Sequence, residues 1–178
     1  MSRTNYITRL VLLISLTLAI TLAGLPQPVT GPLVNTMLLL TTMLLDMTGG
    51  IILGLITPGT AAIRGQLPPI LAPMVPFIML GNVIIVVVFA VIVKSLKSTR
   101  LHKDQPLISP AHWIALVPAS VAKTLWLYYS VKLILPMVFG KQLPEAFIAM
   151  MAIPQLVTAL IGGALAFFLA GILVKVLK

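Results

Sequence analysis

The stretch AFIAMMAIPQLVTALIGGALAFFLAGILV, residues 146–174, decides the fold class because it contains no charged side chain. Residues 65–93 form a second stretch without charge. An apolar run of about 18 residues or more is long enough to cross the hydrocarbon core of a bilayer as a helix. The sequence therefore predicts an all-α integral membrane protein.

Composition supports this prediction along the whole chain. Of the 178 residues, 60% are hydrophobic and 8% are charged, whereas a soluble domain carries about 25% charge. With about 20 residues for each span, the chain has room for one compact domain over residues 1–178 and for no separate soluble domain. We predict six transmembrane helices, at about residues 6–24, 33–45, 51–63, 70–93, 111–135 and 146–173.

The distribution of basic residues predicts the orientation. With six spans, the two termini and the polar segment 94–110 lie on one side. That side carries Arg3, Arg9, Lys94, Lys97, Arg100, Lys103, Lys175 and Lys178. The opposite side carries only Arg64 and Lys141. The positive-inside rule then places both termini in the cytoplasm, in a multi-pass protein of a prokaryotic cell membrane.

Several classes of function are disfavoured by what the sequence lacks. No phosphate-binding G-x-x-x-x-G-K-[ST] motif is present, and no cysteine is available for an iron–sulfur cluster or a thiolate zinc site. His102 and His112 alone make a weak metal signal. The positive net charge reflects topology and not nucleic-acid binding, because no basic helix with interleaved aromatics is found. We expect no catalytic residue, no metal and no cofactor.

Small residues recur at four-residue spacing in two of the predicted spans. In the first span they are Ser15, Ala19 and Ala23, which lie on one helix face and allow another helix to approach closely. This face either packs against the protein's own helices or docks a separate membrane partner. A similar series in the last span, Gly162, Ala166 and Ala170, is interpreted as internal packing.

The segment LPQPVTGPLVN, residues 25–35, contains prolines and a glycine that we expect to break the helix on the outer side. It is either a plain connector or a lid over a binding cavity, with Asn35 just inside the second span. Broken backbone near the membrane is tolerated where protein or a water-filled cavity covers it.

The fifth span carries two lysines, Lys123 and Lys132. An intramembrane lysine is costly and is a functional candidate by default. At about 100° per residue, the two lysines point in opposite directions. Lys132 is near the outer end and reaches water beside Tyr129. We predict that Lys123, Trp126 and Ser130 face a cavity, with Tyr129 as a further substrate contact or an interfacial anchor.

Isolated amides occur in two other apolar spans, Asn82 in the fourth and Gln155 in the last. Each lies about 15 Å from the outer end of its helix at 1.5 Å per residue, and Lys123 has a comparable depth. Either these groups bridge helices through hydrogen bonds, or they converge on one ligand.

Taken together, these features resemble the substrate-binding S component of energy-coupling factor (ECF) transporters. NTMLLLTTMLLDMTGGIILGLITP (residues 35–58) resembles the hairpin of spans 2 and 3 in that family, and VAKTLWLYYSVKLILP (residues 121–136) resembles its span 5. The resemblance implies a six-helix protein that binds a vitamin-like nutrient near the outer face and is not an enzyme. It also implies a membrane T component and two cytoplasmic ATPases as partners, with Ser15, Ala19 and Ala23 as the surface for the T component.

We therefore predict a substrate-specificity component of a vitamin importer. Trp126 would stack on the ligand, Lys123 would pair with a carboxylate or an acceptor-rich edge, and Asn82 and Gln155 would add hydrogen bonds. The alternatives are a lipid-modifying membrane enzyme, which lacks the expected acidic or histidine cluster, and an ion-coupled carrier or channel. A carrier of that kind often has an internal repeat with matched broken helices, and no clear repeat is found.

Overall fold

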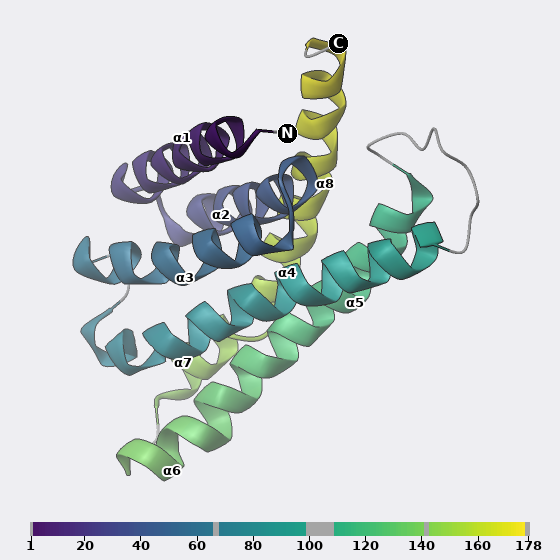
Figure 1. Cartoon of the computed structure of the whole chain (residues 1–178). Helices are drawn as coiled ribbons and strands as arrows, with labels where there is room; N and C mark the ends of the chain where they lie inside the picture. Colours follow the sequence, from purple (N-terminus) through teal and green to yellow (C-terminus); the bar gives the residue numbers. More distant parts are fainter. Residues whose placement is uncertain (1, 66–67, 99–108, 141–142, 177–178) are drawn as a thin grey trace.

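The computed structural model describes residues 2–65, 68–98, 109–140 and 143–176. Within these ranges the chain is helical and contains no strand. The helices form six successive segments along the chain (Figure 1). The predicted all-α fold class is confirmed.

The first three segments are single helices: α1 (Arg3–Leu22), α2 (Gln27–Leu44) and α3 (Met47–Ile63). Asp46 caps α3, because its carboxylate accepts a hydrogen bond from the backbone N–H of Gly49 at 2.8 Å. Pro58 lies inside α3 without interrupting it.

The prediction of a broken loop over residues 25–35 is wrong. Helix α2 already begins at Gln27 and includes both Pro28 and Pro32. Pro28 is in the first turn, where a backbone N–H would have no partner within the helix, so proline costs little there. Asn35 therefore lies in the middle of α2 and not at its start.

The last three segments are composite. A 3₁₀ helix, η1 (Pro69–Met74), leads into α4 (Val75–Ser98). Helix α5 (Pro110–Tyr129) continues through a π-helical turn, η2 (Ser130–Ile134), into α6 (Leu135–Phe139). The short α7 (Glu145–Met150) precedes α8 (Ile153–Val176).

Four of these segments are long and apolar enough to cross a membrane: Arg3–Leu22, Pro69–Leu96, Pro110–Val138 and Glu145–Leu173. Helix α3 is a shorter apolar helix. Helix α2 is not among these candidate spans; it carries Gln27, Asn35 and several threonines. In Figure 1 the start of α1 and the end of α8 lie in the upper part of the molecule, and α6 lies at the bottom left.

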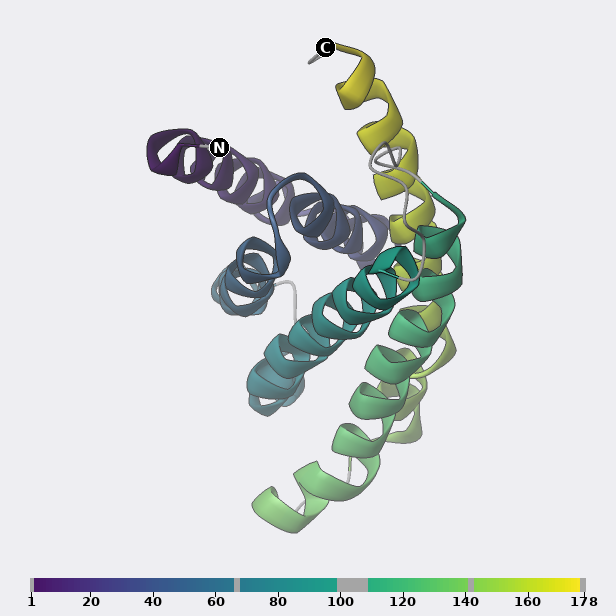
Figure 2. The same cartoon turned by 45° about the vertical axis from the view of Figure 1, so that its right-hand side comes forward.

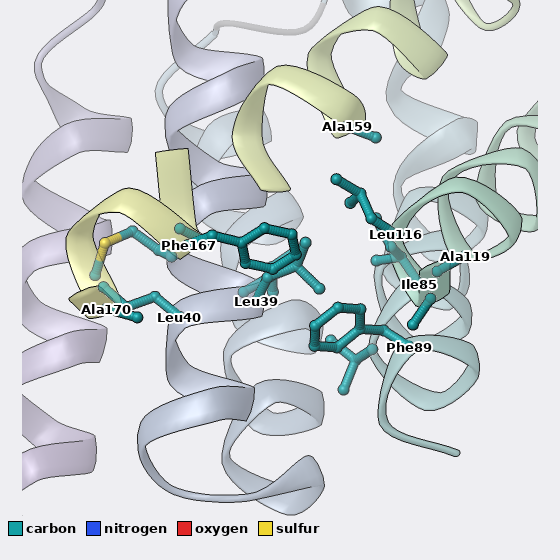
Figure 3. Close-up of a cluster of buried hydrophobic side chains, with 14 of the residues drawn as sticks. Leu39, Leu40, Ile85, Phe89, Leu116, Ala119, Ala159, Phe167 and Ala170 are labelled. Atoms are coloured by element: carbon teal, nitrogen blue, oxygen red, sulfur yellow. The ribbon is translucent and has the colours of Figure 1, made fainter. Parts of the chain in front are cut away.

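The core is built where α8 crosses α2 and where α4 runs beside α5 (Figures 1 and 2). The rings of Phe89 and Phe167 stack with centroids 6.0 Å apart. Figure 3 shows these rings among Leu39, Ile85 and Leu116, all of which are buried. A second apolar cluster includes Leu71, Met74, Leu127 and Val131, and Trp126 packs against it.

Helix α1 is at the edge of the molecule and packs only on α2 and α3 among the described elements with substantial contacts (Figure 2). The Tyr6 hydroxyl donates a hydrogen bond to Asp46 Oδ1 at 2.9 Å. At the other end of the helix, Arg64 Nε donates to the carbonyl oxygen of Leu22 at 3.3 Å. Most of the remaining α1 surface is exposed.

Candidate functional site

A buried lysine joins three helices. Lys123 of α5 is 3% exposed, and its Nζ donates to Asn35 Oδ1 of α2 at 2.6 Å and to Asn82 Oδ1 of α4 at 2.9 Å. Asn82 Nδ2 in turn donates to the carbonyl oxygen of Gly54 on α3 at 3.2 Å. The network therefore connects α2, α3, α4 and α5 through polar contacts.

The close approach of α3 and α4 depends on Gly54. A side chain at this position would begin 3.0 Å from the Cβ atom of Asn82. Glycine lets the α3 backbone come near enough to present its carbonyl oxygen to the Asn82 amide. The amide nitrogen of Asn82 is bound to the Gly54 carbonyl, and this contact directs the amide oxygen of Asn82 toward Lys123.

Lys123 has no acidic partner within the described parts of the chain, where no ion pair is found. Asp46 is held by Tyr6 and by the start of α3, and Glu145 begins α7. Burying an ammonium group is costly unless it is paired and hydrogen-bonded. The two asparagine oxygens occupy two of its three N–H donors, which leaves a positive charge and one donor for a further group.

A cavity of about 80 Å³ opens beside this network. It lies between α1, α2, α3, α4, α5 and the start of α8. Its polar lining residues are Thr21, Gln27, Thr30, Asn35, Thr57, Asn82, Lys123 and Gln155.

The threonines in this lining present acceptors. The Thr57 hydroxyl donates to the Leu53 carbonyl at 2.6 Å, and the Thr30 hydroxyl donates to the Leu25 carbonyl at 2.8 Å. Since each hydroxyl proton is already used, the oxygen keeps its acceptor capacity. The cavity thus combines one cationic donor with several neutral polar groups.

Of the residues singled out from the sequence, Asn35, Asn82, Lys123 and Gln155 line this cavity together. Gln155 is partly exposed, and its Nε2 has one long contact of 3.4 Å with the Met150 carbonyl. Gln27 and the threonines were not singled out. Gln27 was missed because the segment that contains it was interpreted as a loop, whereas it is the first residue of α2.

The structure does not bring Trp126, Tyr129 and Ser130 to this cavity. The Trp126 indole N–H donates to the Phe77 carbonyl at 2.8 Å, and the two rings are 6.3 Å apart. Ser130 is fully buried, with no hydrogen-bond partner for its hydroxyl in the described structure. Tyr129 is 50% exposed and packs on the ring of Tyr128.

For Ser130 the reason is distance along the helix axis. Residues 123 and 130 share a face of α5, but seven residues separate them by about 10 Å at 1.5 Å per residue. Lys123 is the only residue of the described α5 that lines the cavity. Residues on one face of a helix therefore need not line the same cavity. Lys132 points away from it: the side chain is exposed and donates to the Tyr128 hydroxyl at 2.9 Å.

The two series of small residues have different surroundings. Ser15, Ala19 and Ala23 of α1 are exposed. Ala166 and Ala170 of α8 are completely buried, and Gly162 of the same series is buried against α2. The expectation of internal packing is confirmed for α8. No element in the described part of the chain covers the α1 series.

Comparison with known proteins identifies the family. A family model described as the ECF transporter, substrate-specific component, matches residues 5–174. The chain belongs to this family. No curated protein and no solved structure matches it.

As an ECF substrate-specific component, the chain is a multi-pass membrane protein that takes part in transport and is not an enzyme. Membership implies a substrate and the partners of the ECF module.

Proposed function

We propose that the cavity beside Lys123 is the substrate site of this ECF component, and that it binds a small nutrient through a carboxylate or another acceptor-rich group. The observation that carries the proposal is the environment of Lys123. Lys123 is 3% exposed. Its ammonium group is held by two amide oxygens at 2.6 and 2.9 Å and meets no acidic side chain in the described ranges. An anionic ligand supplies the missing counter-charge.

The asparagines position the ammonium group for this task. Asn35 and Asn82 are almost completely buried, so water does not compete for their oxygens. Because they approach from α2 and α4, Lys123 is held between two helices and cannot turn away from the cavity. Gln27 and Gln155 line the same cavity and supply neutral hydrogen bonds that select among anionic ligands.

We assign delivery of the substrate to partners in the membrane and cytoplasm. The chain has no nucleotide-binding motif of the Walker type, so a membrane T component and two ATPases would supply the energy. The exposed series Ser15, Ala19 and Ala23 on α1 offers the T component a surface on which helix backbones can approach closely.

The test compares two lysine variants of the same helix. We expect wild-type protein, purified from cells grown in rich medium, to retain a small anionic molecule that mass spectrometry identifies. Lys123→Met should lower the affinity for that molecule about 30-fold or more, because truncating one partner of a buried charged pair costs about 2–5 kcal/mol.

Lys132→Met is the matched control, since Lys132 is an exposed lysine in η2, which continues directly from α5. It should retain the molecule as the wild type does. Thermal unfolding of both variants checks that they are folded. Equal retention by both would show that Lys123 does not hold the substrate.

A further inference from the structure

A second hollow adjoins the proposed substrate cavity. It is a groove of about 580 Å³ between the N-terminal parts of α2 and α8. Its walls are almost entirely apolar and include Pro28, Pro32, Ile153, Val157 and Ile161. Ile153 is 72% exposed, and Val157 and Ile161 are nearly half exposed, so the groove opens outward from the helix bundle.

Two glutamines connect the groove with the cavity. Gln27 and Gln155 belong to the walls of both. The Gln27 side chain is exposed, and Gln155 makes only a 3.4 Å contact with the Met150 carbonyl. Both side chains are long and weakly held, so each can turn aside for a ligand that passes from one hollow to the other.

The sizes of the two hollows indicate that a ligand occupies both. The cavity has about 80 Å³, which is well below the roughly 300–1,000 Å³ of ordinary small-molecule sites. Together with the groove of about 580 Å³, the space falls within that range. A ligand anchored at Lys123 therefore extends past the glutamines.

A ligand that extends from the cavity into a polar hollow is less favoured. A third hollow of about 310 Å³ lies at the ends of α1 and α3 and is lined by residues 24–27, Arg64 and Gly65. It shares only Gln27 with the cavity. The apolar groove shares two residues with the cavity, Gln27 and Gln155.

We infer that the substrate is an amphipathic anion, with its charged head at Lys123 and an unbranched apolar tail in the groove between α2 and α8. This inference rests on the substrate role proposed for the cavity. Each methylene that the groove buries should raise the affinity about fourfold, which corresponds to about 0.8 kcal/mol.

The experiment uses acetate, butanoate, hexanoate and octanoate as probes, with the primary alcohols of the same lengths for comparison. Affinities are measured by ligand-observed NMR on protein in nanodiscs, with protein-free nanodiscs as the blank for partition into lipid. For wild-type protein we expect the carboxylate affinity to rise about fourfold per methylene, and each carboxylate to bind more tightly than its alcohol.

Groove-filling variants separate the tail from the head. Val157→Trp changes a residue of the groove that does not line the cavity. It should leave acetate binding unchanged and abolish the gain with chain length. Leu165→Trp, at a partly exposed position of α8 outside both hollows, should behave like wild type. Ile161→Trp repeats the test if Val157→Trp is not obtained folded.

Two results would overturn the inference. One is an equal chain-length gain in wild type and in both groove variants, which would place the tail in lipid. The other is tighter binding of succinate or adipate than of hexanoate, lost in Arg64→Gln, which would place the tail in the polar hollow. Failure of the head assignment is seen separately: Lys123→Met would then keep the preference for carboxylates over alcohols.

Discussion

The two series of small residues in α1 and α8 have the same spacing and opposite environments. In α8, Gly162 lies so close to α2 that a Cβ atom would be 2.6 Å from both the Asn35 Cβ atom and the Pro32 carbonyl oxygen. In α1, Ala19 and its neighbours at the same spacing are exposed. One pattern thus seals an internal contact, and the other leaves a surface uncovered.

This difference shows what four-residue spacing does and does not specify. It produces a smooth helix face in both cases. Whether that face is covered depends on the opposite helix, and α2 offers a matching partner to α8. The Thr36 hydroxyl of α2 donates to the Gly162 carbonyl at 3.0 Å, a contact that only a close backbone approach permits.

The largest effect should follow a change in the covered series. Gly162→Leu places a side chain against the Pro32 carbonyl and Asn35, and backbone atoms there have little freedom to move. We expect a loss of about 3 kcal/mol or more in the free energy of unfolding, with little folded protein recovered. Leu165→Ala, at a partly exposed position of α8, is the control and should fold normally. Normal folding of Gly162→Leu would contradict the close α2–α8 contact.

A bulky residue in the uncovered series should affect transport and not folding. Ala19 is exposed on α1, so Ala19→Trp should unfold at the wild-type temperature and bind substrate with wild-type affinity. Uptake in cells should be abolished, because the T component can no longer approach. Ser15→Ala keeps the face small and should transport normally. Full uptake by Ala19→Trp would remove the docking role of this face.

The smallest effect should follow the loss of the hydrogen bond between Thr36 of α2 and the Gly162 carbonyl of α8. Thr36→Val keeps the shape of the side chain but removes the contacts with the Gly162 and Pro32 carbonyls at 3.0 and 2.8 Å. Hydrogen bonds between membrane helices contribute about 0.6 kcal/mol on average, and we expect a loss of that size. Thr8→Val, whose hydroxyl donates only within exposed α1, is the control. An equal loss in both would show that the interhelical bond adds nothing.

Much of the fold could be predicted from the sequence because hydropathy reports the apolar helices directly. The opposite directions of Lys123 and Lys132 also followed from helix geometry alone. The start of α2 did not, because Pro28 is compatible with a first helical turn and composition does not distinguish that position from a loop. Trp126 was placed in the cavity from its helix face, whereas its indole N–H is bound to Phe77 at a different depth.

The contact between Lys123 and Asn35 could not be predicted from the sequence either. These residues are far apart in the chain, and their 2.6 Å contact arises from the way α2 crosses the bundle. The sequence indicated which polar groups are unusual for an apolar helix. It did not indicate which pairs of them meet.

Hydrogen bonds near both ends of α1 fix this helix to the two ends of α3. Tyr6 bonds to Asp46, which caps the start of α3, and Leu22 accepts a bond from Arg64, which follows the end of α3. At 1.5 Å per residue, the distance from Tyr6 to Leu22 along α1 is about 24 Å, and the distance from Asp46 to Arg64 along α3 is about 27 Å. A partner helix that docks on the middle of α1 therefore meets a helix that is fixed to α3 near both of its ends.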